Sequence, residues 1–235
     1  GDAQVDVAPG ADVVARDAPS TPDDCTDENN RKIFVLTTEL TTVPYESHLF
    51  RFDPSDLSYT PIGQVVCEVD GSFLRSMAVD RDGNGWATDS RGFLYQVNTT
   101  TAACVKSSFE NEQEGVGSFG MGYASVGESS NERLYITATG SWWTGAPEIA
   151  YRRLGVIDTS ALSVELIGEL EAPTPANMEL TGTGDGRLFG MVVDVRDLRN
   201  VITTIEELDS SSGATVASAT VPVEARSGFA FAQWG

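Results

Sequence analysis

The 235-residue chain carries 15 Lys and Arg residues against 35 Asp and Glu residues, which gives a formal net charge of -20 at pH 7. A field of this sign repels nucleic acid phosphates and anionic lipid headgroups, so we expect no nucleic acid partner. No apolar run approaches the roughly 18 residues that a transmembrane helix needs, so we also expect no transmembrane segment.

Residues 1–24 form an acidic segment rich in Asp, Ala and Pro and without a single aromatic residue. Such a segment buries too little apolar surface to offset the entropy lost on ordering it, so we predict a disordered tether. Residues 25–235 are then left as a single folded domain. Because the first residue is Gly rather than Met, we expect that a leader has been removed.

The tether resembles the segments that follow the lipidated Cys of bacterial surface lipoproteins. This resemblance implies an extracytoplasmic location, whether secreted, periplasmic or on the bacterial cell surface. It also implies a lipid anchor upstream, although no lipobox is visible in the sequence.

Four segments share one pattern, in which an alternating strand leads to an Asp or Asn, a polar turn and a second strand. They are HLFRFDPSDLSYTPIG (48–63), FLYQVNTTTAACVKS (93–107), LGVIDTSALSVELIG (154–168) and TIEELDSSSGATVAS (204–218), with turn residues Asp53, Asn98, Asp158 and Asp209. Alternation with a period of two predicts half-buried strands, and clusters of Asp, Asn, Ser and Thr are typical of hairpin turns.

A second hairpin recurs between these segments, in which a strand rich in small residues meets a polar turn and a more aliphatic strand. Its copies are residues 76–89, 119–138 and 178–194. The two hairpins together make a unit of four antiparallel strands, A to D, repeated every 45 to 60 residues, which is the size and order of a β-propeller blade. We predict blade 2 at 73–109, blade 3 at 117–169 and blade 4 at 176–221.

The first blade lacks its own A strand, because RKIFVLTTE (31–39) matches a B strand. The alternation of small and aromatic residues in SGFAFAQWG (227–235) predicts the missing A strand at the C-terminus. A ring closed in this way protects strand edges from unwanted pairing. The predicted fold is therefore an all-β propeller of four four-stranded antiparallel blades, the alternative being an incomplete five-bladed ring.

The motifs L-F-R-F-D-P, S-M-A-V-D-R-D-G-N-G-W and F-G-M-G-Y resemble the repeats of secreted bacterial β-propeller proteins, many of them lipoproteins of uncharacterised function. The resemblance covers residues 31–235 and implies the propeller fold. It implies no particular activity, because propellers serve as binding proteins, lectins, lactonases and lyases.

One stretch has the opening of a calcium loop, with Asp80, Asp82, Asn84 and Gly85 at loop positions 1, 3, 5 and 6. Position 12, where a bidentate acid closes such a site, is Arg91, and the flanks are predicted strands rather than helices. We therefore interpret the stretch as a tight A–B turn that uses glycine to reach positive φ angles. Weak calcium binding is the alternative.

Three cysteines, Cys25, Cys67 and Cys104, and a single His have no zinc-site spacing. One disulfide and one remaining thiol are expected in an extracytoplasmic chain. Cys67 and Cys104 fall on predicted outer strands of neighbouring blades, so we predict a bond between them, with Cys25 paired to either as the alternative.

Propellers usually bind ligands on the face that carries the B–C and D–A connections. Two B–C connections are long here, and they hold Tyr45, His48, Trp142 and Trp143. Indole faces stack on sugars and apolar side chains, and Trp is enriched where binding energy is concentrated. His48 beside Glu46 is a candidate general base, although a surface His is the more ordinary interpretation.

The sequence thus favours a non-catalytic propeller that binds a protein, peptide or glycan, and it predicts no catalytic residue and no cofactor. Glu110, Glu112 and Glu114 are interpreted as a solvated acidic loop that would share one side if extended. The alternative function is a calcium-dependent hydrolase resembling the propeller lactonases, with Glu179 and Asn177 in the central channel. No serine-hydrolase, zinc-protease or nucleotide-binding fingerprint is present.

Overall fold

The structure, a computed structural model, describes residues 33–41, 43–69, 71–127, 131–139, 153–171, 176–194, 201–222 and 231–232. Three predictions fall outside these residues: the tether at 1–24, the thiol of Cys25, and the pair Trp142 and Trp143. They stay predictions.

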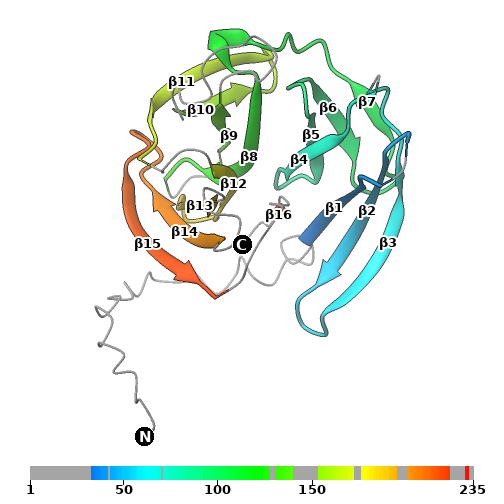
Figure 1. The fold of residues 1–235 in the computed structure, drawn as a ribbon, viewed down its shortest axis with the longest axis horizontal. Helices are drawn as coiled ribbons and strands as arrows, with labels where there is room; N and C mark the ends of the chain where they lie inside the picture. The colour runs from blue at the N-terminus through cyan, green and yellow to red at the C-terminus, as the bar shows by residue number, and fades with distance from the viewer. Residues whose placement is uncertain are drawn as a thin grey trace, which may run out of the picture.

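Sixteen strands form four antiparallel sheets arranged as a ring, so the described chain is a four-bladed propeller (Figure 1). Blade 1 contains β16 (Phe231–Ala232), β1 (Ile33–Glu39), β2 (Glu46–Asp53) and β3 (Ser58–Val65). Blade 2 contains β4 (Leu74–Val79), β5 (Asn84–Asp89), β6 (Leu94–Asn98) and β7 (Cys104–Lys106). Blade 3 contains β8 (Ser118–Ser125), β9 (Glu132–Thr139), β10 (Arg153–Asp158) and β11 (Ser163–Glu169). Blade 4 contains β12 (Ala176–Gly182), β13 (Leu188–Asp194), β14 (Ile202–Leu208) and β15 (Thr215–Val221).

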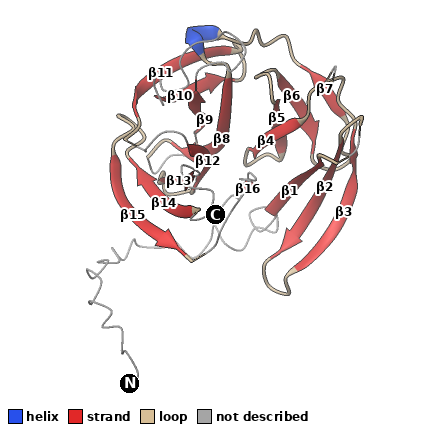
Figure 2. Cartoon of the chain, viewed as in Figure 1, coloured by secondary structure: helices blue, strands red, loops and turns tan. Residues whose placement is uncertain are grey.

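The predicted repeat is confirmed strand by strand, and so is the closure of the ring. Short β16 pairs antiparallel with β1, with Ala232 opposite Phe34 and Phe231 opposite Val35. The C-terminal strand therefore supplies the innermost strand of the first blade, and β16, β4, β8 and β12 surround the centre of the ring (Figure 1). Within the described residues the remaining regular element is a single 3₁₀ turn, Gln113–Gly115, which Figure 2 draws in blue.

Apolar side chains fill the spaces between neighbouring blades, as the alternation of the strands requires. Leu49 of blade 1 and Tyr95 of blade 2 belong to one buried cluster, and Trp86 of blade 2 joins Phe119 of blade 3 in another. A third cluster connects blade 3 to Leu180 and Leu188 of blade 4. The core is therefore divided among the blade interfaces and does not form one central mass.

The four acidic or amide turn residues act as the repeat pattern predicts. A side-chain oxygen of each accepts the backbone N–H two residues later, at distances of 2.8 to 2.9 Å. The residues concerned are Asp53, Asn98, Asp158 and Asp209. Each bond satisfies a turn N–H locally, which is the mechanism by which Asp and Asn favour such turns.

The predicted disulfide is present between Cys67 and Cys104, whose Cα atoms lie 5.1 Å apart. Cys104 begins β7, but Cys67 lies two residues beyond the end of β3, in the D–A connection and not on the strand. The bond therefore joins blade 1 to blade 2 at the outer side of the ring. Within the described ranges, no helix is long and apolar enough to cross a membrane.

Candidate ligand-binding face

Strand direction assigns each connection to one of two faces of the ring. Because neighbouring strands are antiparallel, the B–C and D–A connections share one face, here called the B–C/D–A face. The A–B and C–D turns share the opposite face. In each blade the residue just before an A or C strand, and the residue that ends a B or D strand, lies on the B–C/D–A face.

Tyr45 and Phe73 meet on this face across the boundary between blades 1 and 2. Tyr45 immediately precedes β2 and Phe73 immediately precedes β4. Their ring centroids are 5.4 Å apart at an interplanar angle of 71°, an edge-to-face arrangement, and both side chains are partly exposed. The structure thus places the predicted Tyr45 in a fixed aromatic pair at the rim.

Phe93 adds a third aromatic ring on the same face, immediately before β6. Lys106 Nζ lies 3.8 Å from its ring centroid, and the Arg91 guanidinium carbon lies 5.3 Å from it. Both distances are within the range of cation–π attraction. We call Tyr45, Phe73 and Phe93 the aromatic rim.

A fully buried carboxylate fixes the turn that carries Phe93. Asp89 Oδ1 accepts the backbone N–H groups of Arg91 and Phe93, at 2.9 and 3.0 Å. Its Oδ2 accepts the hydroxyl of Tyr95 at 3.2 Å and lies 3.5 Å from the Arg91 guanidinium. Asp89 therefore holds the backbone of Arg91 and Phe93 in one conformation. Because this turn is already ordered, it loses less conformational entropy when a ligand binds.

His48 is not part of this rim. On β2, Ser47 and Leu49 are buried, so alternation directs His48 to the opposite side of blade 1. Its Nε2 lies 3.8 Å from Glu46 Oε2, and both side chains are about half exposed, at 43% and 52%. The predicted His48–Glu46 pair therefore exists, but as an open surface contact separated from Tyr45.

The centre of the ring contains a buried polar cluster built from three blades. Glu179 on β12 is 6% exposed, and its carboxylate accepts the Ser76 hydroxyl of β4 at 2.7 Å. The Ser76 oxygen in turn accepts the backbone N–H of Met121 on β8 at 3.1 Å. Burial raises the pKa of Glu179 to about 7, against the opposing influence of Ser76 and of the Arg75 charge.

Two backbone features make room for this cluster. A β-bulge shifts the register of β4 between Leu74 and Ser76, and the Arg75 guanidinium donates to the Ser118 hydroxyl at 2.8 Å. Gly120 on β8 faces Glu179, and a Cβ at that position would overlap the Met178 carbonyl and lie 2.8 Å from Glu179 Oε2. The sequence therefore needs a glycine where β8 and β12 approach.

The described residues around Glu179 supply only a small part of the calcium site that the hydrolase hypothesis requires. Calcium takes six to eight oxygen ligands, several of them carboxylates. Glu179 supplies one carboxylate, which accepts the Ser76 hydroxyl, and the side chain of Asn177, the other residue of that hypothesis, lies outside the described part of the structure. Among the described residues no group of three or more His, Cys, Asp or Glu side chains is arranged to hold a metal ion.

Asp80, Asp82 and Asn84 form the A–B turn between β4 and β5. Asp80 Oδ1 accepts the backbone N–H groups of Asp82 and Asn84, at 3.0 and 2.8 Å, so the carboxylate organises the turn itself. The turn interpretation needs one correction. Gly83 has the positive φ, 84°, whereas Gly85 lies in β5, where a Cβ would be 2.7 Å from the Val97 carbonyl.

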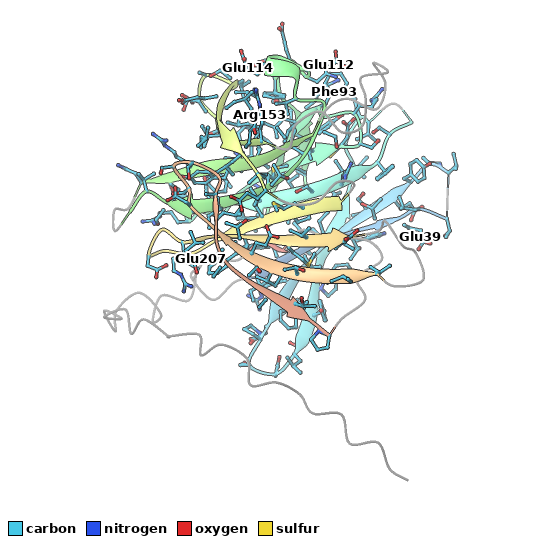
Figure 3. All side chains as sticks on the ribbon, turned by 60° about the vertical axis from the view of Figure 1, so that its left-hand side comes forward. Glu39, Phe93, Glu112, Glu114, Arg153 and Glu207 are labelled. Atoms are coloured by element: carbon cyan, nitrogen blue, oxygen red, sulfur yellow. A yellow bond between two sulfur atoms is a disulfide. The ribbon has the colours of Figure 1, made fainter. Side chains whose placement is uncertain are left out.

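The acidic loop is compact and not extended. Glu112 and Glu114 have positive φ angles of 65° and 51° around the 3₁₀ turn, so the segment is not extended and the condition for a shared side with Glu110 is not met. All three side chains are exposed, and Figure 3 shows Glu112 and Glu114 at the edge of the molecule. The loop is a solvated surface.

Sequence reasoning missed Phe73 and Phe93, and it missed the contact of Glu179 with Ser76. A signal for the aromatics was present, because Tyr45, Phe73 and Phe93 each occupy the residue directly before a strand that starts on the B–C/D–A face. No local signal marks the Glu179–Ser76 pair, since its members are 103 positions apart.

No protein-family model matches the chain, and no curated protein matches its sequence. Among solved structures, the chain is similar to the Dos1 propeller, with 11% identity and a TM-score of 0.41 over 77% of this chain and 45% of that one. It is also similar to the C-terminal WD40 domain of Sif2, with 9% identity and a TM-score of 0.34 over 82% of this chain and 59% of that one. The chain thus spans less than two thirds of both structures, and the fold assignment rests on its own strand pairing.

Proposed function

We propose that the protein is a non-catalytic, extracytoplasmic binding propeller that recognises a protein or peptide partner through the aromatic rim of blades 1 and 2. The observation that carries the proposal is that Tyr45, Phe73 and Phe93 all lie on the B–C/D–A face. Tyr45 and Phe73 are in contact with each other, and the buried Asp89 holds the turn of Phe93 in place. Aromatic residues presented on a rigid scaffold are the usual anchors of protein interfaces.

The charge around the rim supports a partner with acidic groups. Lys106 and Arg91 both lie against Phe93 on a chain whose formal net charge is -20, and since Arg91 is already paired with Asp89, Lys106 is the cation offered to a partner. An ammonium held over an aromatic ring attracts a carboxylate of the partner as a point charge.

The arrangement of the aromatic side chains favours a polypeptide ligand over a glycan. Stacking on a sugar needs an open aromatic face, whereas Phe93 has a Lys106 ammonium 3.8 Å from its centroid. Tyr45 and Phe73 meet edge to face, and the pair offers an apolar surface against which side chains of a polypeptide can pack. Trp142 and Trp143, predicted to contribute to the same face, lie outside the described residues.

The disulfide between Cys67 and Cys104 supports the extracytoplasmic part of the proposal, because such bonds persist in oxidising compartments. It lies in the D–A connection that leads to Phe73, so it ties the base of the aromatic rim to the outer strand of blade 2. The secreted, lipoprotein-like location inferred from the tether remains part of the proposal.

The test is a selection of peptides from a displayed random library on the 235-residue protein, followed by affinity measurements on single variants. Tyr45→Ala and Phe73→Ala should each weaken the selected peptides roughly thirtyfold, the effect of truncating an interface anchor. Tyr59→Ala is the matched control, because Tyr59 pairs with Phe52 at 4.8 Å near the C–D turn on the opposite face. Equal losses in all three variants, or binding to a glycan array without peptide binding, would contradict the proposal.

A further inference from the structure

The outer strands of blades 1, 2 and 3 are each protected against pairing with another chain. Proline at position 61 interrupts β3, β7 has only three residues and ends at Lys106, and β11 carries Glu165 and Glu169. In addition, the Gln113 side chain accepts the backbone N–H of Val164 on β11 at 3.2 Å. Proline, charge, shortness and covering contacts are the devices that keep natural edge strands from associating.

The outer strand of blade 4 has none of these devices among its residues. β15, Thr215–Val221, is seven residues long and reads TVASATV, without a charge, a proline or a glycine. Its five central residues are exposed, Val216 at 64%. Within the described part of the chain, β15 is the end strand of its sheet and pairs on one side, with β14.

The sequence of β15 is nearly palindromic about Ser218. Two copies aligned antiparallel at this residue place Ser218 opposite Ser218, Ala217 opposite Ala219, and Val216 opposite Thr220. Every cross-strand pair is then small or β-branched and uncharged, which is a favourable set for antiparallel strands. Such a two-fold, self-complementary contact is the form that most homodimer interfaces take.

We propose that β15 is a self-association edge, at which a second copy of this chain adds its own β15 antiparallel and centred on Ser218. The pairing joins the two fourth blades into one continuous eight-stranded sheet. It goes beyond the proposed ligand binding, because β15 lies on the outer side of blade 4 and the aromatic rim lies on blades 1 and 2.

The net charge sets how this association responds to salt. Each copy has a formal charge of -20, so two copies repel one another. This repulsion is strong in dilute salt, where charges are screened only weakly. The strand itself is neutral, so the backbone pairing is insensitive to salt. Association should therefore strengthen as NaCl rises from about 0.05 to 0.5 M, a range over which the screening length shortens severalfold.

The test is sedimentation equilibrium of the 235-residue protein over a wide range of protein concentration, at both salt concentrations. The double variant Ala217→Lys/Ala219→Lys puts lysines opposite each other at the two-fold axis and should weaken self-association at least about tenfold. The double variant Ala217→Glu/Ala219→Glu should do the same. A mixture of the two should recover association, because pairing centred on Ser218 then places both lysines of one copy opposite glutamates of the other.

Thr60→Lys on the exposed edge strand β3 is the matched control and should leave self-association unchanged. Circular dichroism of each variant verifies that the ring is folded. A protein that stays monomeric at all concentrations in both salts overturns the proposal. So does undiminished association of the lysine variant, or a failure of the mixed variants to associate.

Discussion

The Ser76 hydroxyl on β4 donates a 2.7 Å hydrogen bond to the Glu179 carboxylate on β12, across the centre of the ring and 103 positions away in the sequence. Ser76 also accepts the backbone N–H of Met121 on β8, so blades 2, 3 and 4 meet at one buried acid. The protonation of Glu179 therefore depends on the packing of these three blades.

Glu179 predicts how stability depends on pH. Its pKa is raised from 4.5 to about 7 in the folded protein, so the folded state holds this proton more tightly than the unfolded state. The associated stabilisation is complete below about pH 4.5 and is lost as pH rises through about 7. Glu179→Gln should remove this slope and raise the free energy of unfolding at pH 8 by up to about 3 kcal/mol.

Urea unfolding of wild type and Glu179→Gln at pH 5 and pH 8 measures this effect. The variant and wild type should differ clearly at pH 8 and little at pH 5. Ser76→Ala provides the comparison, since it keeps the acid but removes a donor that lowers the pKa of Glu179, so its stability should fall at least as steeply with pH as that of wild type. A wild-type stability that does not fall between pH 5 and pH 8 would show that Glu179 is already ionised in the folded ring.

Gly120 predicts a steric limit at the contact between blades 3 and 4. A Cβ at this position would overlap the Met178 carbonyl, which is backbone and cannot rotate away. Gly120→Ala should therefore lower the free energy of unfolding by about 3 kcal/mol, as overpacking against fixed atoms does. Gly63→Ala on β3 is the control, because its nearest neighbour, Ala102 Cβ, lies 3.3 Å away. Thermal melts of the two variants compare them directly, and equal melting temperatures would mean that β8 and β12 are farther apart than the structure has them.

The disulfide predicts a large dependence on reducing agent. Cys67 and Cys104 are 37 positions apart, and closing a loop of this size in the unfolded chain stabilises the folded state by about 3–4 kcal/mol in the chain-entropy account. The double variant Cys67→Ser/Cys104→Ser should lose about this much in urea unfolding under oxidising conditions. Adding a reductant should destabilise wild type to the level of the variant and leave the variant unchanged. A reductant effect of equal size on both proteins would contradict the assignment.

Much of the fold follows from local pattern. The turns at Asp53, Asn98, Asp158 and Asp209 are set by hydrogen bonds within two or three residues, so a repeat search along the chain is enough to find them. The C-terminal strand of blade 1 is also predictable, because the repeat leaves one strand missing at the start and one spare at the end.

The candidate site is less predictable, because its contacts are long-range. Tyr45 was identified as a loop aromatic, but its partner Phe73 belongs to another blade and becomes visible only when the ring is assembled. His48 is close to Tyr45 in the sequence, but the alternation of β2 directs its side chain away from the side of the buried Ser47 and Leu49. Glu179 lies buried on the innermost strand of blade 4, and the bulge at Arg75 and the donor Ser76 beside it have no local signature in the sequence.

The central claim is that partners bind at the aromatic rim of blades 1 and 2. Hydrogen–deuterium exchange of the protein with and without a peptide selected on it measures this most directly. Protection is predicted at residues 43–45, 71–75 and 90–93, with no change at the opposite-face turns 80–84 and 183–187. Protection of the opposite-face turns, with unaltered exchange at 71–75 and 90–93, would contradict the account.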